Sequence, residues 1–148
     1  MLNVGSGGGE FVFLGTQAGF DMTGIEPNEG YANYAISEYK VPILNGMFYE
    51  QDIPAASYDA VTLFHVLEHL QEPIKAIEFL GNLLRADGYL FVEVPSVDSR
   101  VMAPGQKWHF GHLFNFNERT LKAVGFLAGL HPVKVKSSFQ HMLACRQS

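Results

Sequence analysis

Several residue types and segments that mark common protein classes are scarce in this sequence. Cys145 is the only cysteine, so no internal disulfide can form, and a reducing compartment is expected. Ten Lys and Arg residues stand against 15 Asp and Glu residues, and a net charge of −5 disfavours binding to nucleic acid or an anionic membrane. No apolar run is long enough to span a bilayer, and no segment resembles a signal peptide. We therefore expect a cytoplasmic protein.

Apolar residues, in contrast, are plentiful. They make up 47% of the 148 residues, which is enough to build the core of one ordinary globular domain. No internal repeat, linker or low-complexity tract divides the chain. Residues 1–148 are therefore expected to form a single domain.

Strand and helix signals alternate along the chain. Strands are predicted at 2–5, 21–26, 41–48, 58–64, 89–94, 132–136 and 139–145, and helices at 10–18, 28–39, 74–85 and 117–127. Crossovers that carry helices imply parallel strands with both sheet faces covered, whereas the short turn between the last two strands implies an antiparallel hairpin at one edge. The predicted fold is α/β, Rossmann-like and doubly wound.

A glycine-rich turn follows the first predicted strand. Gly5, Gly7 and Gly9 lie between an apolar segment and a helical pattern, where positive φ angles and close approach of a ligand to the backbone are both permitted. A dinucleotide fingerprint would need glycine at the position of Glu10, whose carboxylate would repel a pyrophosphate. A nicotinamide-dependent dehydrogenase is therefore disfavoured. The turn either holds another ligand or simply connects strand to helix.

Glu26 is placed to bind a ribose. It ends the second predicted strand, 21 positions after Gly5, where an acidic side chain can accept hydrogen bonds from both ribose hydroxyls. The alternative is a solvated carboxylate at a strand end.

These features combine into a family resemblance. The chain resembles a class I S-adenosylmethionine-dependent methyltransferase of the small-molecule type over nearly its whole length. The segments that carry the likeness are 2–10, 24–27, 58–61, 64–70 and 88–90, which include Gly-Ile-Glu-Pro and Phe-His-Val-Leu-Glu-His-Leu.

The resemblance implies a seven-stranded sheet and a binding site for S-adenosylmethionine, which becomes S-adenosylhomocysteine after transfer. The methionine part would lie over Gly5 to Gly9, the ribose on Glu26, and the adenine between Pro27 and the segment after the third strand. The cofactor-binding residues that it implies are Gly5, Ser6, Gly7, Gly9, Glu26, Pro27, Met47, Phe48, Asp52, Phe64 and His65. His65 would also face the substrate, a small-molecule methyl acceptor.

Two departures from the family pattern bear on activity. Asn3 stands where such proteins commonly carry an acidic residue, and the chain begins at the first strand, without the helices that usually precede it. A partner chain could supply that cover, which favours a homodimer. Alternatively, the chain is a catalytically silent cofactor-binding or interaction domain of the same fold.

The segment from His65 to His69 also spells HxxEH, a pattern of some zinc peptidases. Two histidines on one helical face could bind zinc, with Glu68 as base. The motif begins at the end of an apolar strand, however, and no third ligand is evident. No metal site is predicted, and Glu68 and His69 are expected to cap and pack the following helix.

The long loop at 96–116 is the other candidate site. Between Gly105 and Phe116 it carries Trp108, His109, His112 and several phenylalanines beside the end of the fifth strand. His109 or His112 could accept a proton from the acceptor, or the loop could be an aromatic plug. Methyl transfer is an in-line displacement, for which positioning alone can suffice. His131 and His141 are expected to be structural.

Overall fold

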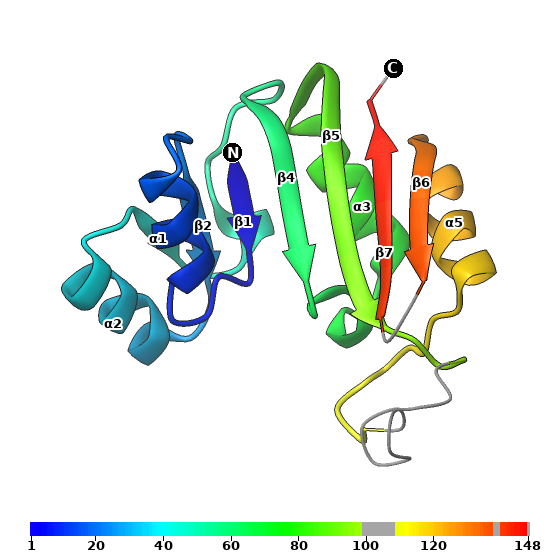
Figure 1. The fold of residues 1–148 in the computed structure, drawn as a ribbon, viewed down its shortest axis with the longest axis horizontal. Coiled ribbons are helices and arrows are strands. Elements are labelled where there is room, and N and C mark those ends of the chain that lie inside the picture. Colours follow the sequence, from blue (N-terminus) through cyan, green and yellow to red (C-terminus); the bar gives the residue numbers. More distant parts are fainter. Residues whose placement is uncertain (99–108, 138–139, 148) are drawn as a thin grey trace.

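Seven segments of the chain pair into one sheet. The computed structural model describes residues 1–98, 109–137 and 140–147, and its strand order is β3-β2-β1-β4-β5-β7-β6 (Figure 1). The strands are β1 (Leu2–Val4), β2 (Thr23–Glu26), β3 (Ile43–Asn45), β4 (Tyr58–Phe64), β5 (Leu84–Pro95), β6 (His131–Ser137) and β7 (Gln140–Arg146).

The strand directions match the predicted architecture. β1 to β5 run parallel to one another, whereas β7 is antiparallel to both β5 and β6. The strand order reverses direction between β1 and β4. Because β1, β2, β4 and β5 are parallel, their carboxyl ends meet at the same edge of the sheet (Figure 1). The predicted seven-stranded, mostly parallel sheet with a C-terminal antiparallel hairpin is confirmed.

Helices begin where the sequence provides caps or a helix-starting proline. The longer helices are α1 (Glu10–Gln17), α2 (Glu29–Tyr39), α3 (Pro73–Asn82) and α5 (Glu118–Leu127). Asn28 accepts a hydrogen bond from the Tyr31 amide at 3.1 Å, and Asn117 accepts one from the Thr120 amide at 2.9 Å. These two predicted N-caps are confirmed. Pro73 occupies the first turn of α3, where its missing N–H costs nothing.

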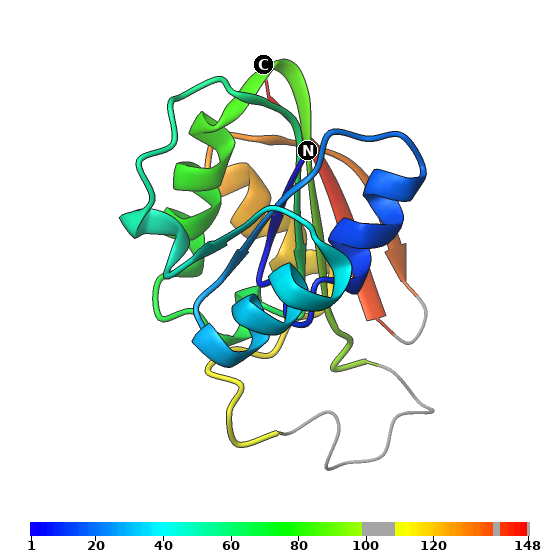
Figure 2. The same cartoon turned by 90° about the vertical axis from the view of Figure 1, so that its left-hand side faces the viewer.

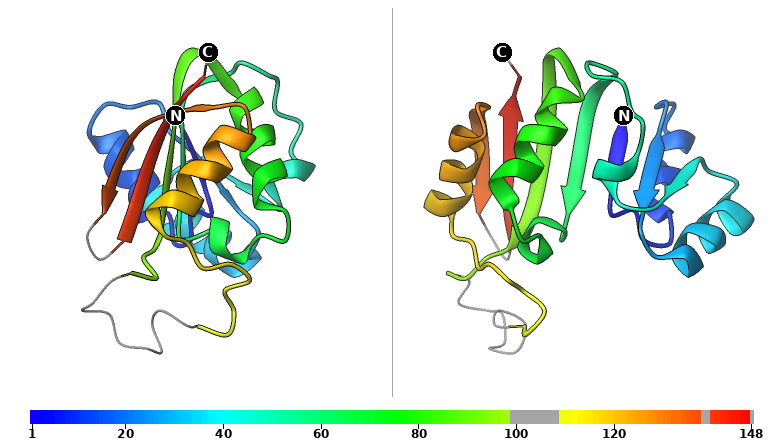
Figure 3. Two further views of the ribbon diagram at one scale, coloured as in Figure 1. Left: turned by 90° about the vertical axis from the view of Figure 1, so that its right-hand side faces the viewer. Right: turned by 180° about the vertical axis from the view of Figure 1, so that it is seen from behind.

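The helices cover the two faces of the sheet unequally. Seen from behind, α3 and α5 lie over β5, β7 and β6, while α1 and α2 lie at the opposite side beside β1 to β3 (Figures 2 and 3). No helix among the described residues covers the front of β4, β5 and β7 (Figure 1). The predicted cover of both faces therefore holds only in part, and Tyr89 on β5 remains 38% exposed.

Two apolar clusters hold the layers together. The larger includes Leu63 and Leu90 on the sheet, Leu80 on α3 and Leu121 on α5, all with no exposed surface. The smaller fastens α1 and α2 to the sheet and consists of Val12, Met22, Ala32, Ala35, Val41 and Ile43. Full burial of one such leucine stabilises the fold by about 1.5–3 kcal/mol.

Several predicted boundaries are wrong. Helix α3 ends at Asn82 rather than Arg85, because Leu84 already pairs with Tyr58 and starts β5. The register between β4 and β5 then shifts. Asp87 and Gly88, which were predicted to end the helix, lie in the resulting irregularity of β5, with Asp87 at φ 65°. The third strand comprises three residues instead of the predicted 41–48.

Part of the long loop lies outside the described residues. That part is 99–108 and contains Gly105 and Trp108, while Phe139 of the last predicted strand also lies outside them. At the ends of the loop, Ser96 forms an isolated parallel bridge with Phe116, and the Val97 amide donates to the Phe116 carbonyl at 3.1 Å. The start of the loop is thus brought back beside its end.

Candidate active site

The glycine turn lies at the edge of the sheet where the carboxyl ends of the parallel strands meet. Gly5, Gly7 and Gly9 have φ values of 73°, 53° and 87°, which residues with a Cβ rarely adopt. A Cβ on Gly5 would lie 2.3 Å from Cγ2 of Val66, and one on Gly9 would lie 2.5 Å from Cβ of Ala35. Glycine is therefore required by both backbone conformation and space at these two positions.

The turn uses much of its own hydrogen-bonding capacity. The amides of Gly5 and Ser6 both donate to the Ile25 carbonyl, at 2.9 and 3.0 Å, and the Gly9 amide donates to the Ser6 carbonyl at 2.9 Å. The Gly7 amide donates to Glu26 at 2.7 Å. The turn therefore offers a ligand a close-fitting surface more than a set of free amide donors.

Glu26 connects this turn to the start of α2. Its carboxylate is 7% exposed, and its two oxygens accept from the amides of Gly7 at 2.7 Å and Asn28 at 2.8 Å. A carboxylate oxygen can accept more than one hydrogen bond, so both keep capacity for a ligand hydroxyl. The side chain also lines a cavity beside the turn.

This cavity has a volume of about 350 Å³, within the range of small-molecule sites. It lies between the ends of β1, β2 and β4, and its walls are mainly apolar. The lining residues are Val4, Gly5, Ile25, Glu26, Pro27, Gly46, Met47, Phe48, His65, Val66, His69 and Leu70. An apolar slot with one buried carboxylate suits a flat heterocycle joined to a sugar.

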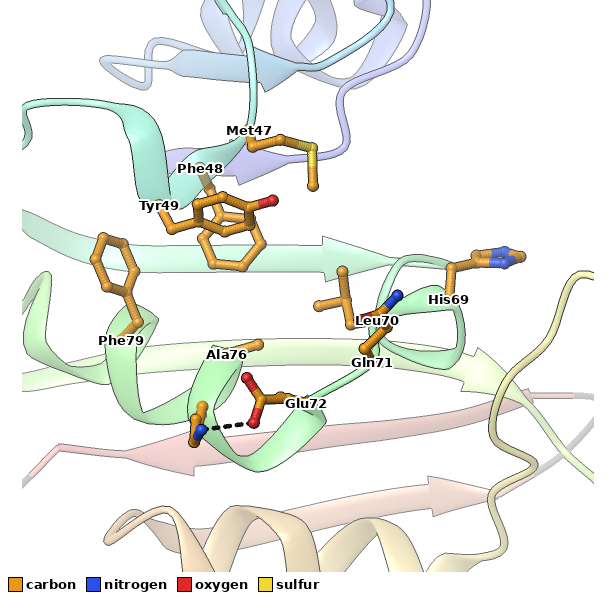
Figure 4. Close-up of a pocket in the computed structure, with 10 residues that line it drawn as sticks. Met47, Phe48, Tyr49, His69, Leu70, Gln71, Glu72, Ala76 and Phe79 are labelled. Atoms are coloured by element: carbon orange, nitrogen blue, oxygen red, sulfur yellow. Dashed lines mark hydrogen bonds and ion pairs between the residues drawn. The ribbon is translucent and has the colours of Figure 1, made fainter.

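A second cavity of about 540 Å³ adjoins the first. In Figure 4, Met47, Phe48 and Tyr49 lie on one side of it, facing Phe79 and Ala76 of α3 across the opening. Met47, Phe48, His69 and Leu70 line both cavities. The two cavities therefore form neighbouring parts of one recessed surface.

His65 lies at the end of β4 with an unusual backbone, at φ 56°. Its Nδ1 is 3.5 Å from Oε1 of Glu68, its Nε2 is 3.2 Å from Oε1 of Glu93, and the Gln140 amide is hydrogen-bonded to the same Nε2. The Glu68 carboxylate, with smaller help from Glu93, raises the pKa of His65 although burial acts against it. These contacts fix its ring beside the first cavity.

Glu68 and His69 form their own 3₁₀ turn, η2 (Leu67–His69). They do not cap α3, whose N-cap is Glu72, so the predicted capping role is wrong. Glu68 is 1% exposed and lies between His65 and His69, whose Nε2 is 4.0 Å from Oε1. The two histidines of the HxxEH pattern therefore do not share one helical face.

The described part of the long loop folds back onto this turn. The amides of Leu113 and Phe114 donate to the Glu68 carbonyl at 2.8 and 3.2 Å. The ring centroid of His112 lies 5.0 Å from that of His69 and 5.3 Å from that of His109. Burial lowers the pKa of His112, because the charged imidazolium is poorly solvated there.

The structure brings six of the thirteen predicted site residues to the walls of the cavities. Gly5, Glu26, Pro27, Met47, Phe48 and His65 line the first cavity. Among the described residues, Ser6, Gly7, Gly9, Asp52, Phe64, His109 and His112 line neither cavity. Asp52 is exposed, and Phe64 packs edge-on against Phe11 with ring centroids 5.0 Å apart.

Sequence reasoning missed six residues of the first cavity's wall, namely Val4, Ile25, Gly46, Val66, His69 and Leu70. The last three follow the end of β4, and their place after the carboxyl end of a central strand was the available signal. Asn3, in contrast, donates to Oγ1 of Thr62 at 2.9 Å within the sheet.

Comparison with known proteins identifies the family. Residues 1–135 match a family model described as a methyltransferase domain. The chain belongs to the methyltransferase domain family. Among the residues that the structure describes, this methyltransferase domain has no helix of the length and hydropathy needed to cross a membrane.

Two bacterial relatives of this methyltransferase domain are ubiquinone biosynthesis O-methyltransferases. The protein from Bordetella avium is 31% identical over 100 residues, which cover 62% of this chain and 40% of the relative. The protein from Haemophilus ducreyi is 34% identical over 103 residues, which cover 62% of this chain and 43% of the relative. The matched part thus amounts to about two fifths of the relatives' length.

A solved structure shows the same fold. It is the 1,6-didemethyltoxoflavin-N1-methyltransferase of Burkholderia thailandensis, solved with S-adenosylhomocysteine, which is 20% identical with a TM-score of 0.79. The match covers 99% of this chain and 70% of that one. The predicted methyltransferase family is therefore confirmed by the family model, and the predicted fold is confirmed by this solved structure.

Proposed function

We propose that this domain binds S-adenosylmethionine in the first cavity and transfers its methyl group to an oxygen, nitrogen or carbon of a small-molecule acceptor. The observation that carries the proposal is Glu26, a buried carboxylate that faces an apolar cavity beside the glycine turn. The O-methyltransferase relatives make oxygen the first acceptor atom to test.

The residues present fit this cofactor. Glu26 would accept the ribose hydroxyls, Met47 and Phe48 would flank the adenine, and the glycine turn would carry the methionine part. When bound, the cofactor supplies an activated methyl group on a sulfonium. The chain's own groups bind and orient the two reactants and limit access of water, which is what an in-line displacement requires.

The role of the histidines remains a prediction. His65 lies beside the first cavity, whereas His109 and His112 stand on the loop that folds against η2. Each could hold an acceptor or receive its proton. Because positioning can suffice for transfer, the proposal does not require a catalytic base.

Calorimetric titration with S-adenosylhomocysteine tests binding, and mass spectrometry of a panel of small-molecule oxygen, nitrogen and carbon acceptors incubated with S-adenosylmethionine tests transfer. We expect saturable one-to-one binding and a mass increase of one methyl group. A folded sample that binds no ligand at high micromolar concentration would contradict the proposal. Binding without transfer to any acceptor would instead identify a catalytically silent cofactor-binding domain.

A homodimer and a cytoplasmic location are further proposals. Sedimentation velocity of the purified chain over a range of concentrations tests the first, and fractionation of cells that contain the native protein tests the second.

A further inference from the structure

Three potential metal ligands converge beside the two cavities. Glu68 and His69 come from η2, and His112 comes from the loop that precedes α5. One ligand atom from each of these side chains lies within 4.8 Å of the other two. The fold therefore supplies the third ligand that the HxxEH pattern lacks in the sequence.

Glu68 is the unusual member of this group. Its side chain is almost completely buried, and neither carboxylate oxygen has a hydrogen-bond partner among the described residues. The nearest ring nitrogen, Nδ1 of His65, lies at an ion-pair distance of 3.5 Å. Glu68 thus interacts with His65 at ion-pair distance, but its buried oxygens keep unused hydrogen-bonding capacity, which is costly and favours a further cationic partner.

The ring of His69 is oriented as a metal ligand would be. Its Nδ1 lies 2.8 Å from the Gly111 carbonyl oxygen, which can only accept, so Nδ1 carries the proton. In the neutral ring the lone pair then belongs to Nε2, the nitrogen that lies 4.0 Å from Oε1 of Glu68. A backbone carbonyl that fixes the tautomer of a histidine is a common support of metal-binding imidazoles.

We propose that Glu68, His69 and His112 bind one divalent transition-metal ion, with Zn²⁺ as the best match. A carboxylate and two imidazoles form a usual zinc ligand set, and three protein ligands leave a fourth position open for water or another ligand. Ligand atoms around a tetrahedral zinc lie about 3.3–3.5 Å apart, given bonds of about 2.0–2.1 Å. Small rotations of the partly exposed His69 and His112 side chains would bring the ligand atoms from their present separations of up to 4.8 Å to this distance.

This site differs from that of an HxxEH peptidase. His65, the first histidine of the pattern, is not a ligand here, since its Nε2 faces Glu93 and Gln140. Glu68 is a ligand rather than a base. The metal ion would join the end of β4 to the loop after β5, where the Leu113 and Phe114 amides already bind the Glu68 carbonyl.

Metal binding can be tested independently of methyl transfer. The chain is first freed of metal by dialysis against a chelator, and Zn²⁺ is then titrated by calorimetry. Co²⁺ serves as a spectroscopic substitute, because its visible absorption reports coordination by the protein. We expect one Zn²⁺ per chain, a Co²⁺ spectrum of low coordination number, and a rise in the thermal unfolding midpoint with excess Zn²⁺.

Two histidine variants distinguish the proposed metal site from nonspecific binding of Zn²⁺ to surface histidines. His112→Gln removes a ligand from the loop, and His131→Gln removes an imidazole from the exposed start of β6. We expect His112→Gln to weaken Zn²⁺ binding at least about tenfold and to change the Co²⁺ spectrum, because even supporting groups of metal sites contribute 10–100-fold. His131→Gln should bind as the wild type does.

The buried ligand needs its own control. Glu68→Gln should also lose Zn²⁺ binding, and its circular dichroism spectrum verifies that it is folded. Wild-type protein that is folded yet binds no Zn²⁺, or a His112→Gln variant with unchanged affinity and Co²⁺ spectrum, would overturn the proposal.

Discussion

Gly5 at the end of β1 lies against Val66 after β4, so closely that a Cβ on Gly5 would be 2.3 Å from Cγ2 of that valine. We expect Gly5→Ala to destabilise the protein by roughly 2–4 kcal/mol, because it adds steric overlap to an unfavourable φ of 73°. Urea unfolding followed by circular dichroism measures the change.

A matched glycine separates the two causes. Gly19 has φ 89°, but a Cβ there would meet nothing within 4 Å, so Gly19→Ala should cost only the conformational part, about 1–2 kcal/mol. In a Val66→Ala background the cost of Gly5→Ala should fall. An equal cost in both backgrounds would show that the overlap with Val66 is relieved in another way.

Glu26 is expected to contribute to cofactor affinity directly. Glu26→Ala should weaken S-adenosylhomocysteine binding by roughly 1–3 kcal/mol, because two ribose hydroxyls would lose their acceptor. Calorimetry measures the affinity, and circular dichroism verifies the fold, since the same carboxylate holds the Gly7 amide. Glu29→Gln, an exposed carboxylate nearby on α2, is the control and should bind normally. An unchanged affinity in Glu26→Ala would remove this residue from the site.

His141 should make stability depend on pH. Burial lowers the pKa of this side chain, whose Nε2 is 2.8 Å from Oγ of Ser96, although Asp98 and Glu118 act in the opposite direction. Because the unfolded chain takes up this proton more readily, the free energy of unfolding should fall as pH drops below about 6.5, the ordinary value. Between pH 7.5 and 5.5, the free energy of unfolding measured in urea should fall less in His141→Gln than in the wild type. An equal fall in both proteins would contradict the assignment of this pH dependence to His141.

Cys145 should be chemically inert in the folded protein. Its thiol has no exposed surface, and burial raises its pKa to about 11. Relative to the reference value of 9.0, this leaves on the order of 100-fold less thiolate near neutral pH, and the thiolate is the reactive form. Ellman's reagent should therefore label the native chain far more slowly than the chain in urea. Comparable rates would show that the site between β7 and α5 opens readily.

The sequence predicted the elements whose signals are local. Asn28 and Asn117 are caps that act within one helical turn, and Pro73 starts a helix through its own ring. The boundary between α3 and β5 was missed because it depends on a distant partner. Leu84 continues the helical apolar pattern, yet its pairing with Tyr58 places it in the sheet.

The candidate site shows the same division between local and distant signals. The glycine turn and Glu26 could be recognised from their spacing, since parallel strands place their carboxyl ends together. The approach of His112 to Glu68 and His69 could not, because it depends on how a long loop returns across the sheet edge. Such loop paths follow from packing and have no periodic pattern in the sequence.

The internal hydrogen bonds of the glycine turn have a consequence for the kinetics of ligand binding. The amides of Gly5, Ser6, Gly7 and Gly9 are already engaged within the protein, so the turn has its shape before a ligand arrives. Association that requires no prior ordering of a loop avoids a slow conformational step. We therefore expect the observed rate of S-adenosylhomocysteine binding to rise linearly with ligand concentration, as in a one-step encounter.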